Sequence, residues 1–188
     1  MIVQRLASLL SSVLLSLFFF VPQAQPLRFE ITSQFAPVSG RLFVVIGRTQ
    51  SPEPRTMIDE AGPAAVPVLA RDVRDLGTGV TASIDRSAEI FPIRSLDDLQ
   101  PGDYYIQALL HSNTDLKSLD APGTEYSDVQ HVHLDPRNGT AIRLDLTKIV
   151  PPERLPSDDE YIKYVRIQSN LLTAFHRRPR QRSNARCG

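Results

Sequence analysis

The chain has 188 residues, 41% of them hydrophobic and 22% charged, which is enough for one globular domain with a real core but hardly for two. Fifteen prolines scattered between short apolar runs, nine glycines and no tryptophan favour many short strands over long helices. The formal net charge is zero, but without Arg5 and the five arginines after residue 176 the body has 15 basic and 21 acidic residues. A body at −6 excludes a nucleic-acid-binding surface.

Residues 1–26 have the pattern of a secretory signal peptide. Arg5 supplies a positive n-region, residues 6–21 form an apolar stretch interrupted only by serines, and a Pro-Gln-Ala-Gln-Pro sequence follows. The stretch is shorter than the roughly 20 apolar residues that a membrane-spanning helix needs. We therefore expect a secreted or periplasmic protein with no stable membrane insertion after cleavage. The Ala-x-Ala cleavage pattern is missing, which leaves a retained signal anchor open.

Residues 27–150 are predicted to form a mainly β domain, an immunoglobulin-like two-sheet sandwich of six to eight strands. Strict alternation at 27–35 predicts a half-buried strand, and 41–48 (RLFVVIGR), apolar on both faces, predicts a central strand paired with it. The proline-rich residues 49–67 are expected to form a surface connection. Further strands are predicted at 66–73, 80–84 and 104–111, and residues 88–91 lead into the stretch that contains the last of them. The disulfide of antibody domains is excluded, because Cys187 is the single cysteine.

The best-determined stretch is 95–111, SLDDLQPGDYYIQALLH. Pro101 and Gly102 predict a chain reversal, with Gly102 tolerating a positive φ, and Leu96 and Leu99 are expected to pack beneath it. A tyrosine just after such a turn can bury its ring while its hydroxyl bonds backbone upstream, as in the tyrosine corner of immunoglobulin-like sandwiches. Tyr104 or Tyr105 fits this role, and one of the two rings is predicted to be buried.

The end of the predicted domain contains a hairpin pattern. Residues 129–134 and 140–146 are expected to pair through a turn at 135–139, with Asn138 and Gly139 at positive φ. Residues 151–176 follow as a proline-rich linker and a segment whose 161–175 part fits a strand as well as a helix that begins with a capping box at Ser157. Residues 177–188, RRPRQRSNARCG, are predicted to be a disordered basic tail.

Candidate sites are sparse. His131 and His133 share one strand face, as metal ligands can, but an exposed histidine pair beside a hairpin is the more ordinary interpretation. Acidic residues at 97–98 and 158–160 suit Ca²⁺, although acidic turns that cap and solubilise are commoner. The sequence Asn138-Gly139-Thr140 matches an N-glycosylation acceptor. Neither a Gly-x-Ser-x-Gly elbow nor a phosphate-binding loop is present, since Gly-Thr-Gly at 77–79 is too short, and His111 and His176 add nothing specific. We therefore predict no catalytic, metal or cofactor-binding residue.

Four segments together carry a family resemblance: GRLFVVIGR, FPIRSLDDLQPGDYYIQALL, DVQHVHLDPRNGTAIRLDLTKIVPP and YIKYVRIQSNLLTAFHRRP. They resemble the N-terminal part of secreted bacterial esterases of the enterochelin-esterase type, over about residues 29–179. The resemblance implies an immunoglobulin-like domain followed by an α/β-hydrolase domain, of which residues 164–179 would be the first strand. Beyond them the chain departs from the family pattern, so no catalytic residue is carried over.

These observations lead to three functional hypotheses. The first is a non-catalytic accessory β-sandwich module of a secreted esterase-like protein, acting by packing or recognition, with an α/β-hydrolase domain as the implied partner. The second is a fragment of a serine hydrolase that is active only with a catalytic domain. The third is a stand-alone secreted module that binds a ligand or carbohydrate.

Overall fold

The computed structural model describes residues 26–114, 116–137, 139, 141–152, 154–165, 167 and 169–172. Residues 1–25 of the predicted signal peptide, the basic tail, and Asn138 and Thr140 of the glycosylation sequence lie outside these residues. The chain divides into two compact units, Met1–Pro152 and Glu153–Gly188.

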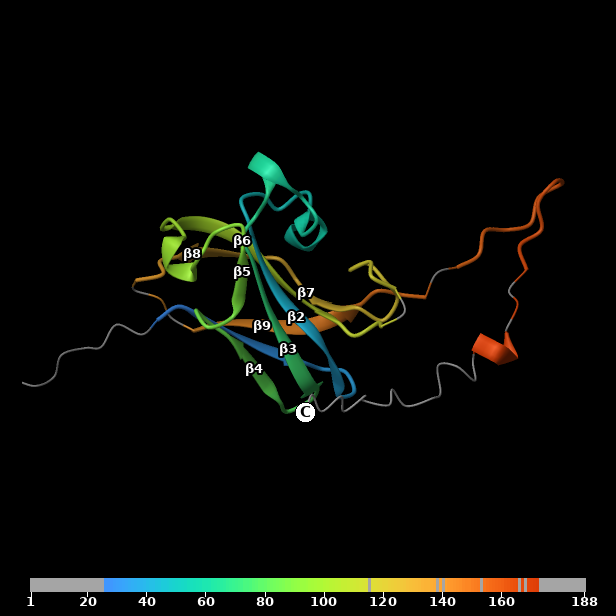
Figure 1. The fold of residues 1–188 in the computed structure, drawn as a ribbon, viewed down its shortest axis with the longest axis horizontal. Helices are drawn as coiled ribbons and strands as arrows, with labels where there is room; N and C mark the ends of the chain where they lie inside the picture. The colour runs from blue at the N-terminus through green and yellow to red at the C-terminus, as the bar shows by residue number, and fades with distance from the viewer. Residues whose placement is uncertain are drawn as a thin grey trace, which may run out of the picture. The chain divides into compact units, whose positions relative to one another are not determined.

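The first unit is built from β-strands and short 3₁₀ turns (Figure 1). The strands are β1 (Arg28–Ser33), β2 (Val38–Gly47), β3 (Val68–Leu76), β4 (Thr81–Ile84), β5 (Glu89–Phe91), β6 (Gly102–His111), β7 (Glu125–Ser127), β8 (Gln130–Leu134) and β9 (Ala141–Ile149). The 3₁₀ turns are η1 (Pro54–Met57), η2 (Gly62–Ala64) and η3 (Leu96–Asp98). The predicted mainly β class is confirmed for the described residues.

Backbone hydrogen bonds join all the described strands into one sheet. The order is β4-β1-β9-β7-β6-β2-β3-β5, with β8 paired to β6 beside this path. Strands from both halves of this order, β1 and β9 in one and β2 and β6 in the other, contribute to one core. The sheet therefore curves over itself. The central residues of this core are fully buried and come from β1, β9, β2 and β6: Phe29, Ile31, Leu144, Leu42, Val44 and Ile106. Burial of this apolar surface is the main stabilising contribution of the fold.

The two halves of the sheet meet at β7, which lies between β9 and β6 in the strand order and which we call the β7 seam. This three-residue strand pairs with β6 on one side and β9 on the other, and the register to β9 shifts between Tyr126 and Ser127. Ser127 bridges the irregularity, since its hydroxyl accepts a hydrogen bond from the Ala108 amide at 3.0 Å and donates one to the Asp128 carbonyl at 2.9 Å. The buried side chain of Gln107 also donates to the Ser127 carbonyl at 2.9 Å. Side chains therefore satisfy polar groups that a regular ladder would pair.

Two predicted strand pairings are wrong. β2 does not pair with β1 but with β3 and β6, whereas β1 lies between β4 and β9 and runs parallel to β9. Likewise, β8 and β9 do not form a hairpin, because β8 pairs with β6 and β9 pairs with β1 and β7. Their inward faces are as predicted, with Leu134 and Leu144 completely buried. Alternation thus identified the buried face but not the neighbouring strand.

Gly139 also differs from its predicted role. Its φ is not positive; a Cβ at this position would lie 2.5 Å from the Cα of Leu27. The glycine is therefore required by close approach of two backbone segments rather than by a left-handed turn conformation.

The turn before β6 contains the predicted tyrosine corner. The Tyr104 ring is 2% exposed, and its hydroxyl donates to the Gln100 carbonyl at 2.6 Å. Leu96 and Leu99 are buried in the same core, as predicted. Ser95 and Asp98 cap η3 reciprocally, which fixes the turn. Gly102, however, does not adopt a positive φ, because it is already the first residue of β6.

The described part of the second unit contains no strand, and only residues 170–172 are helical. The carboxylate of Asp159 accepts hydrogen bonds from the amides of Tyr161 and Ile162, both at 2.7 Å, so the acidic cluster caps a turn there in place of the predicted box at Ser157. Several large apolar side chains of the second unit are solvent-exposed: Tyr161, Val165, Ile167, Leu171 and Leu172.

Candidate functional site

The outer face of β2, β3 and β5 is apolar, although an outer sheet face is usually polar. The cause is the sequence of β2, where Phe43 and Val45 alternate with the inward-facing residues of the main core. Cross-strand register extends the apolar surface, because Phe43 is opposite Ala70 of β3, while Val45 is opposite Val68. Phe91 of β5 lies next to Val68 in the same row and is 61% exposed.

The connection between β2 and β3, residues 48–67, covers part of this face. A second hydrophobic cluster forms beneath it around the buried residues Val45, Val66 and Leu109. Met57 and Ile58 of the connection pack on this cluster. The prediction that β2 is covered on both sides is therefore confirmed for the part around Val45, where the proline-rich connection is the outer cover.

Polar contacts fasten the connection to the sheet. Arg55 donates to Glu53 at 2.8 Å, forms an ion pair with Asp120, and lies over the Tyr126 ring at 4.3 Å from its centroid. The amide of Arg55 also donates to the side chain of Gln107 in β6 at 3.0 Å. The hydrogen bond from Arg55 lowers the pKa of Glu53, against the opposing effect of burial. These contacts hold the connection in one position on the outer face.

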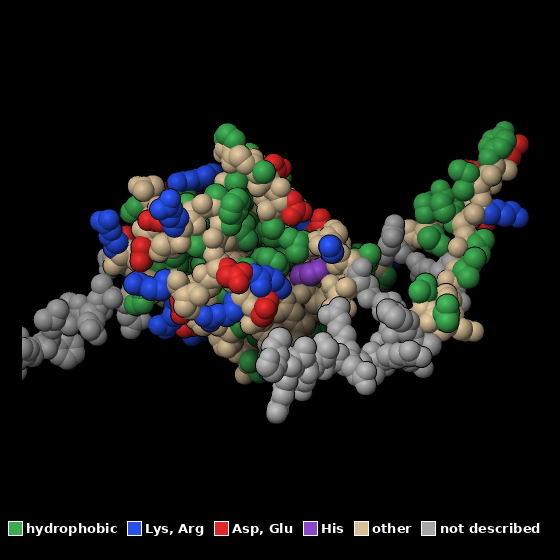
Figure 2. Space-filling model, in the orientation of Figure 1, with side chains coloured by type: hydrophobic (Ala, Val, Ile, Leu, Met, Phe, Trp, Pro, Cys, Tyr) green, Lys and Arg blue, Asp and Glu red, His purple; other side chains and the backbone are tan. Residues whose placement is uncertain are grey.

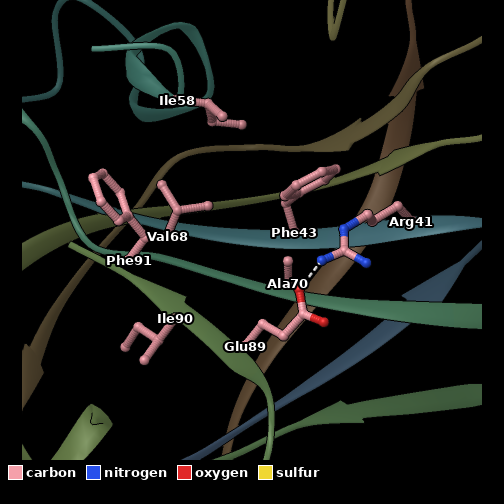
Figure 3. Close-up of a pocket in the computed structure, with 8 residues that line it drawn as sticks. All are labelled: Arg41, Phe43, Ile58, Val68, Ala70, Glu89, Ile90 and Phe91. Atoms are coloured by element: carbon pink, nitrogen blue, oxygen red, sulfur yellow. Dashed lines mark hydrogen bonds and ion pairs between the residues drawn. The ribbon is translucent and has the colours of Figure 1, made fainter. Parts of the chain in front are cut away.

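A groove remains where the cover ends, and we call it the β5 groove. It has a volume of about 300 Å³, and its lining residues are Arg41, Phe43, Ile58, Val68, Ala70, Glu89, Ile90 and Phe91. Figure 3 shows Phe43, Val68 and Phe91 on one side of the sheet, with Ile58 of the connection above them. In Figure 2, hydrophobic side chains gather on this face between the connection above and charged side chains below. The β5 groove is thus an open, mostly apolar depression.

An ion-pair cluster forms one end of the β5 groove. Arg41 donates to Asp72 at 2.9 Å and pairs with Glu89, an interaction drawn as a dashed line in Figure 3. Burial alone would lower the pKa of Arg41, but the hydrogen bonds and charges of Asp72 and Glu89 outweigh it and raise the pKa. The guanidinium carbon lies 6.0 Å from the centroid of the Phe43 ring, so charge borders the apolar floor.

The second long edge of β5 has no strand partner among the described residues. β5 stands at one end of the strand order and pairs only with β3 there. Such an edge presents unpaired amide and carbonyl groups to an added strand. The β5 groove therefore combines apolar side-chain contacts with main-chain hydrogen-bonding capacity.

The predicted histidine pair lies on the outward face of β8, away from this groove. Both side chains are exposed, and each pairs across to β6. The ring of His131 stacks on Tyr105 with centroids 4.6 Å apart, and Nδ1 of His133 lies 2.8 Å from a carboxylate oxygen of Asp103. The described residues contain no group of three or more His, Cys, Asp or Glu side chains suited to a metal ion. The geometry thus shows two separate cross-strand pairs.

The other candidates have local structural partners. Asp97 pairs with Arg86 at 3.6 Å, and Asp98 accepts the amide of Ser95 at 3.1 Å. His111 contacts the Thr124 hydroxyl at 3.2 Å. The Gly-Thr-Gly turn approaches the chain closely, since a Cβ on Gly77 would lie 2.7 Å from Pro37. His176 lies outside the described residues, as does most of the glycosylation sequence.

Glu125 is the buried acidic residue of the seam at β7. Its side chain accepts a hydrogen bond of 2.6 Å from the Ser33 hydroxyl. Burial raises the pKa of Glu125, and the hydrogen bond from Ser33 opposes that shift only in part. A carboxyl in this position is a structural group with a pH-dependent contribution to stability.

Sequence reasoning did not identify the β5 groove. The available signal was the apolar pattern on both faces of residues 41–48, together with a phenylalanine next to a proline at 91–92. Locating the groove also required the register of β2, β3 and β5, because its residues come from four separate parts of the chain.

No family model matches the chain, and neither a curated protein nor a solved structure shows significant similarity to it. Across the part of the chain that the structure describes, no helix combines the length and apolarity needed to cross a membrane.

Proposed function

We propose that this chain is a non-catalytic, immunoglobulin-like β-sandwich module of a secreted protein, and that it recognises an extended apolar segment of a partner protein through the β5 groove. The observation that carries the proposal is the uncovered apolar face beside a free strand edge. Exposed apolar surfaces bordered by polar residues mark interaction sites in soluble proteins.

The immunoglobulin-like part of the proposal is supported by the tyrosine corner. In such sandwiches a buried tyrosine near the start of a core strand bonds backbone a few residues upstream. Tyr104 has this geometry toward Gln100, at the start of the strand that lies at the centre of the core. The two halves of the curved sheet would then correspond to the two layers of the sandwich.

The extended conformation of the ligand follows from the groove's geometry. A strand added beside β5 would place alternate side chains next to Phe91 at the border of the groove, while its backbone pairs with the free edge. The ion pair of Arg41 with Glu89 at one end would favour a polar residue there. Main-chain hydrogen bonds would supply affinity and the apolar floor would supply specificity.

The esterase resemblance supports a context for this module. It suggests an α/β-hydrolase domain as the partner, with the module acting in packing or recognition beside it. The exposed apolar residues of the second unit, such as Val165, Ile167 and Leu171, favour a second candidate, in which residues 157–176 begin a further folded domain.

The proposal is tested by selecting peptides from a phage-displayed library of linear sequences on the full chain. We expect enriched peptides with apolar residues at alternate positions, and we expect their binding to be lost in Phe91→Asp. Val80→Asp is the matched control, because Val80 is also an exposed apolar residue but lies outside the groove. Failure to enrich such peptides, or equal binding to Phe91→Asp and the unmodified chain, would contradict the proposal.

A further inference from the structure

A second cavity, which shares no lining residue with the β5 groove, lies at the carboxyl end of β2. It has a volume of about 360 Å³, is open to solvent, and is lined by the 48–67 connection and the turn that leads into β6. Ile46, Leu99 and Tyr104 contribute buried apolar surface to it. The wall formed by Ala64 and Ala65 has small side chains, which leave this space unfilled. The volume is within the range of small-molecule sites in proteins.

Arg48, an exposed residue, brings a positive charge to the mouth of the cavity. Its guanidinium carbon lies 3.9 Å from the centroid of the Tyr104 ring, and one of its nitrogens donates to the Tyr104 hydroxyl at 2.7 Å. A second nitrogen lies 3.5 Å from the Asp103 carbonyl. Because the tyrosine corner fixes Tyr104, it also fixes the guanidinium before any ligand arrives.

The charge of Arg48 is not neutralised within the described residues. No carboxylate there lies within ion-pair distance of it, in contrast to Arg41 and Arg55. A guanidinium has five donors in a planar fork that matches a carboxylate, and the contacts of Arg48 leave several of them available.

We propose that this cavity is a binding site for a small organic monocarboxylate with an apolar body. The carboxylate would bind Arg48, and the apolar body would lie against Ile46, Leu99 and the alanine wall. The carboxylate of Asp98 also lines the cavity, so a ligand with a second negative charge is disfavoured. This site goes beyond the proposed peptide recognition, and each can fail independently of the other.

The test is a titration of the ¹⁵N-labelled full chain with 3-phenylpropanoate, followed through amide chemical shifts. Saturable shifts are expected at residues around the cavity, with millimolar or tighter affinity. The neutral 3-phenylpropanamide should bind about tenfold more weakly, because it lacks the charge-assisted contact. Arg48→Gln should lose a similar factor and Arg48→Lys less, whereas Arg74→Gln, which changes an exposed arginine outside the cavity, should bind as the unmodified chain does.

A second variant keeps the test decisive if Arg48→Gln disturbs the turn. Ala65→Phe places a large side chain in the cavity and leaves Arg48 intact, so it should abolish the saturable shifts. Absence of saturable shifts in the unmodified chain would overturn the proposal. Unchanged affinity in Arg48→Gln or in Ala65→Phe would overturn it as well.

Discussion

Replacing Tyr104 by alanine removes the largest fully buried side chain near the start of β6. The ring is 2% exposed and contributes to the main core. Truncation of a large buried aromatic residue to alanine costs about 3–5 kcal/mol, because it combines lost transfer free energy with a residual cavity. We expect Tyr104→Ala to lower the free energy of unfolding by that amount, which is a large fraction of the stability of a typical domain.

The hydroxyl contribution can be measured separately with Tyr104→Phe. This change keeps the ring but removes the donor to the Gln100 carbonyl and the acceptor of the Arg48 guanidinium. Net contributions of single hydrogen bonds are roughly 0.5–1.5 kcal/mol, and an acceptor left without its partner costs more. We therefore expect a loss of about 1–2 kcal/mol for Tyr104→Phe.

Urea unfolding followed by far-ultraviolet circular dichroism measures both losses. Tyr105 provides the matched control, because it is the next residue of the same strand but is only half-buried and stacks on His131. Tyr105→Ala should cost about 1 kcal/mol or less, as expected for a cross-strand pair on the outer face. Equal and small losses at both positions, or an unchanged stability in Tyr104→Phe, would refute the tyrosine-corner argument.

Three further predictions concern the seam, a close contact and the second unit. Burial raises the pKa of Glu125, so the folded state favours its protonated form, and the associated stability is present at low pH and lost as the pH rises through the raised pKa. Glu125→Gln, which resembles the protonated form, should therefore stabilise the chain more at pH 8 than at pH 4. Equal effects of this variant in urea unfolding at the two pH values would contradict the prediction. Gly139→Ala should lower stability by about 1–3 kcal/mol in the same assay, because its Cβ would collide with the backbone of Leu27, and a neutral result would show that the contact relaxes freely. A chain ending at Pro156 should be less prone to aggregate in light scattering than the full chain, and no less stable, because exposed apolar residues such as Val165 are removed; a clearly more stable and strictly monomeric full chain would show that the segment belongs to the core.

Local sequence patterns predicted which residues are buried more successfully than which strands are neighbours. Alternation identified the inward positions of Phe29, Leu134 and Leu144, since the side-chain period of a strand depends only on the strand itself. The partner of a strand is a property of the whole fold. The parallel contact of β1 with β9 joins Phe29 to Ile142 across more than half of the chain, and nothing within either segment specifies it.

The irregular strand β7 was missed for a related reason. Its three residues, Glu125, Tyr126 and Ser127, are too few for a periodic signal, and two of them are buried polar residues. Their burial depends on side-chain hydrogen bonds to Ser33 and Ala108, which come from distant strands. The β5 groove was beyond sequence reasoning in the same way, because its floor exists only once three strands are in register.

The two halves of the curved sheet are joined along one border by backbone pairing and along the other by a side chain. On one side the β7 seam provides backbone hydrogen bonds, while on the other Arg71 of β3 reaches across to the β4 end, donating to the Ser83 carbonyl at 2.6 Å and the Ser87 hydroxyl at 2.5 Å. One side chain can release its contacts far more easily than a cooperative backbone ladder. Slow motions that admit solvent to the core should therefore begin between β3 and β4, and the amides of β4 should exchange with deuterium earlier than those of β6. The interior of the first unit would then open preferentially on the side that Arg71 closes.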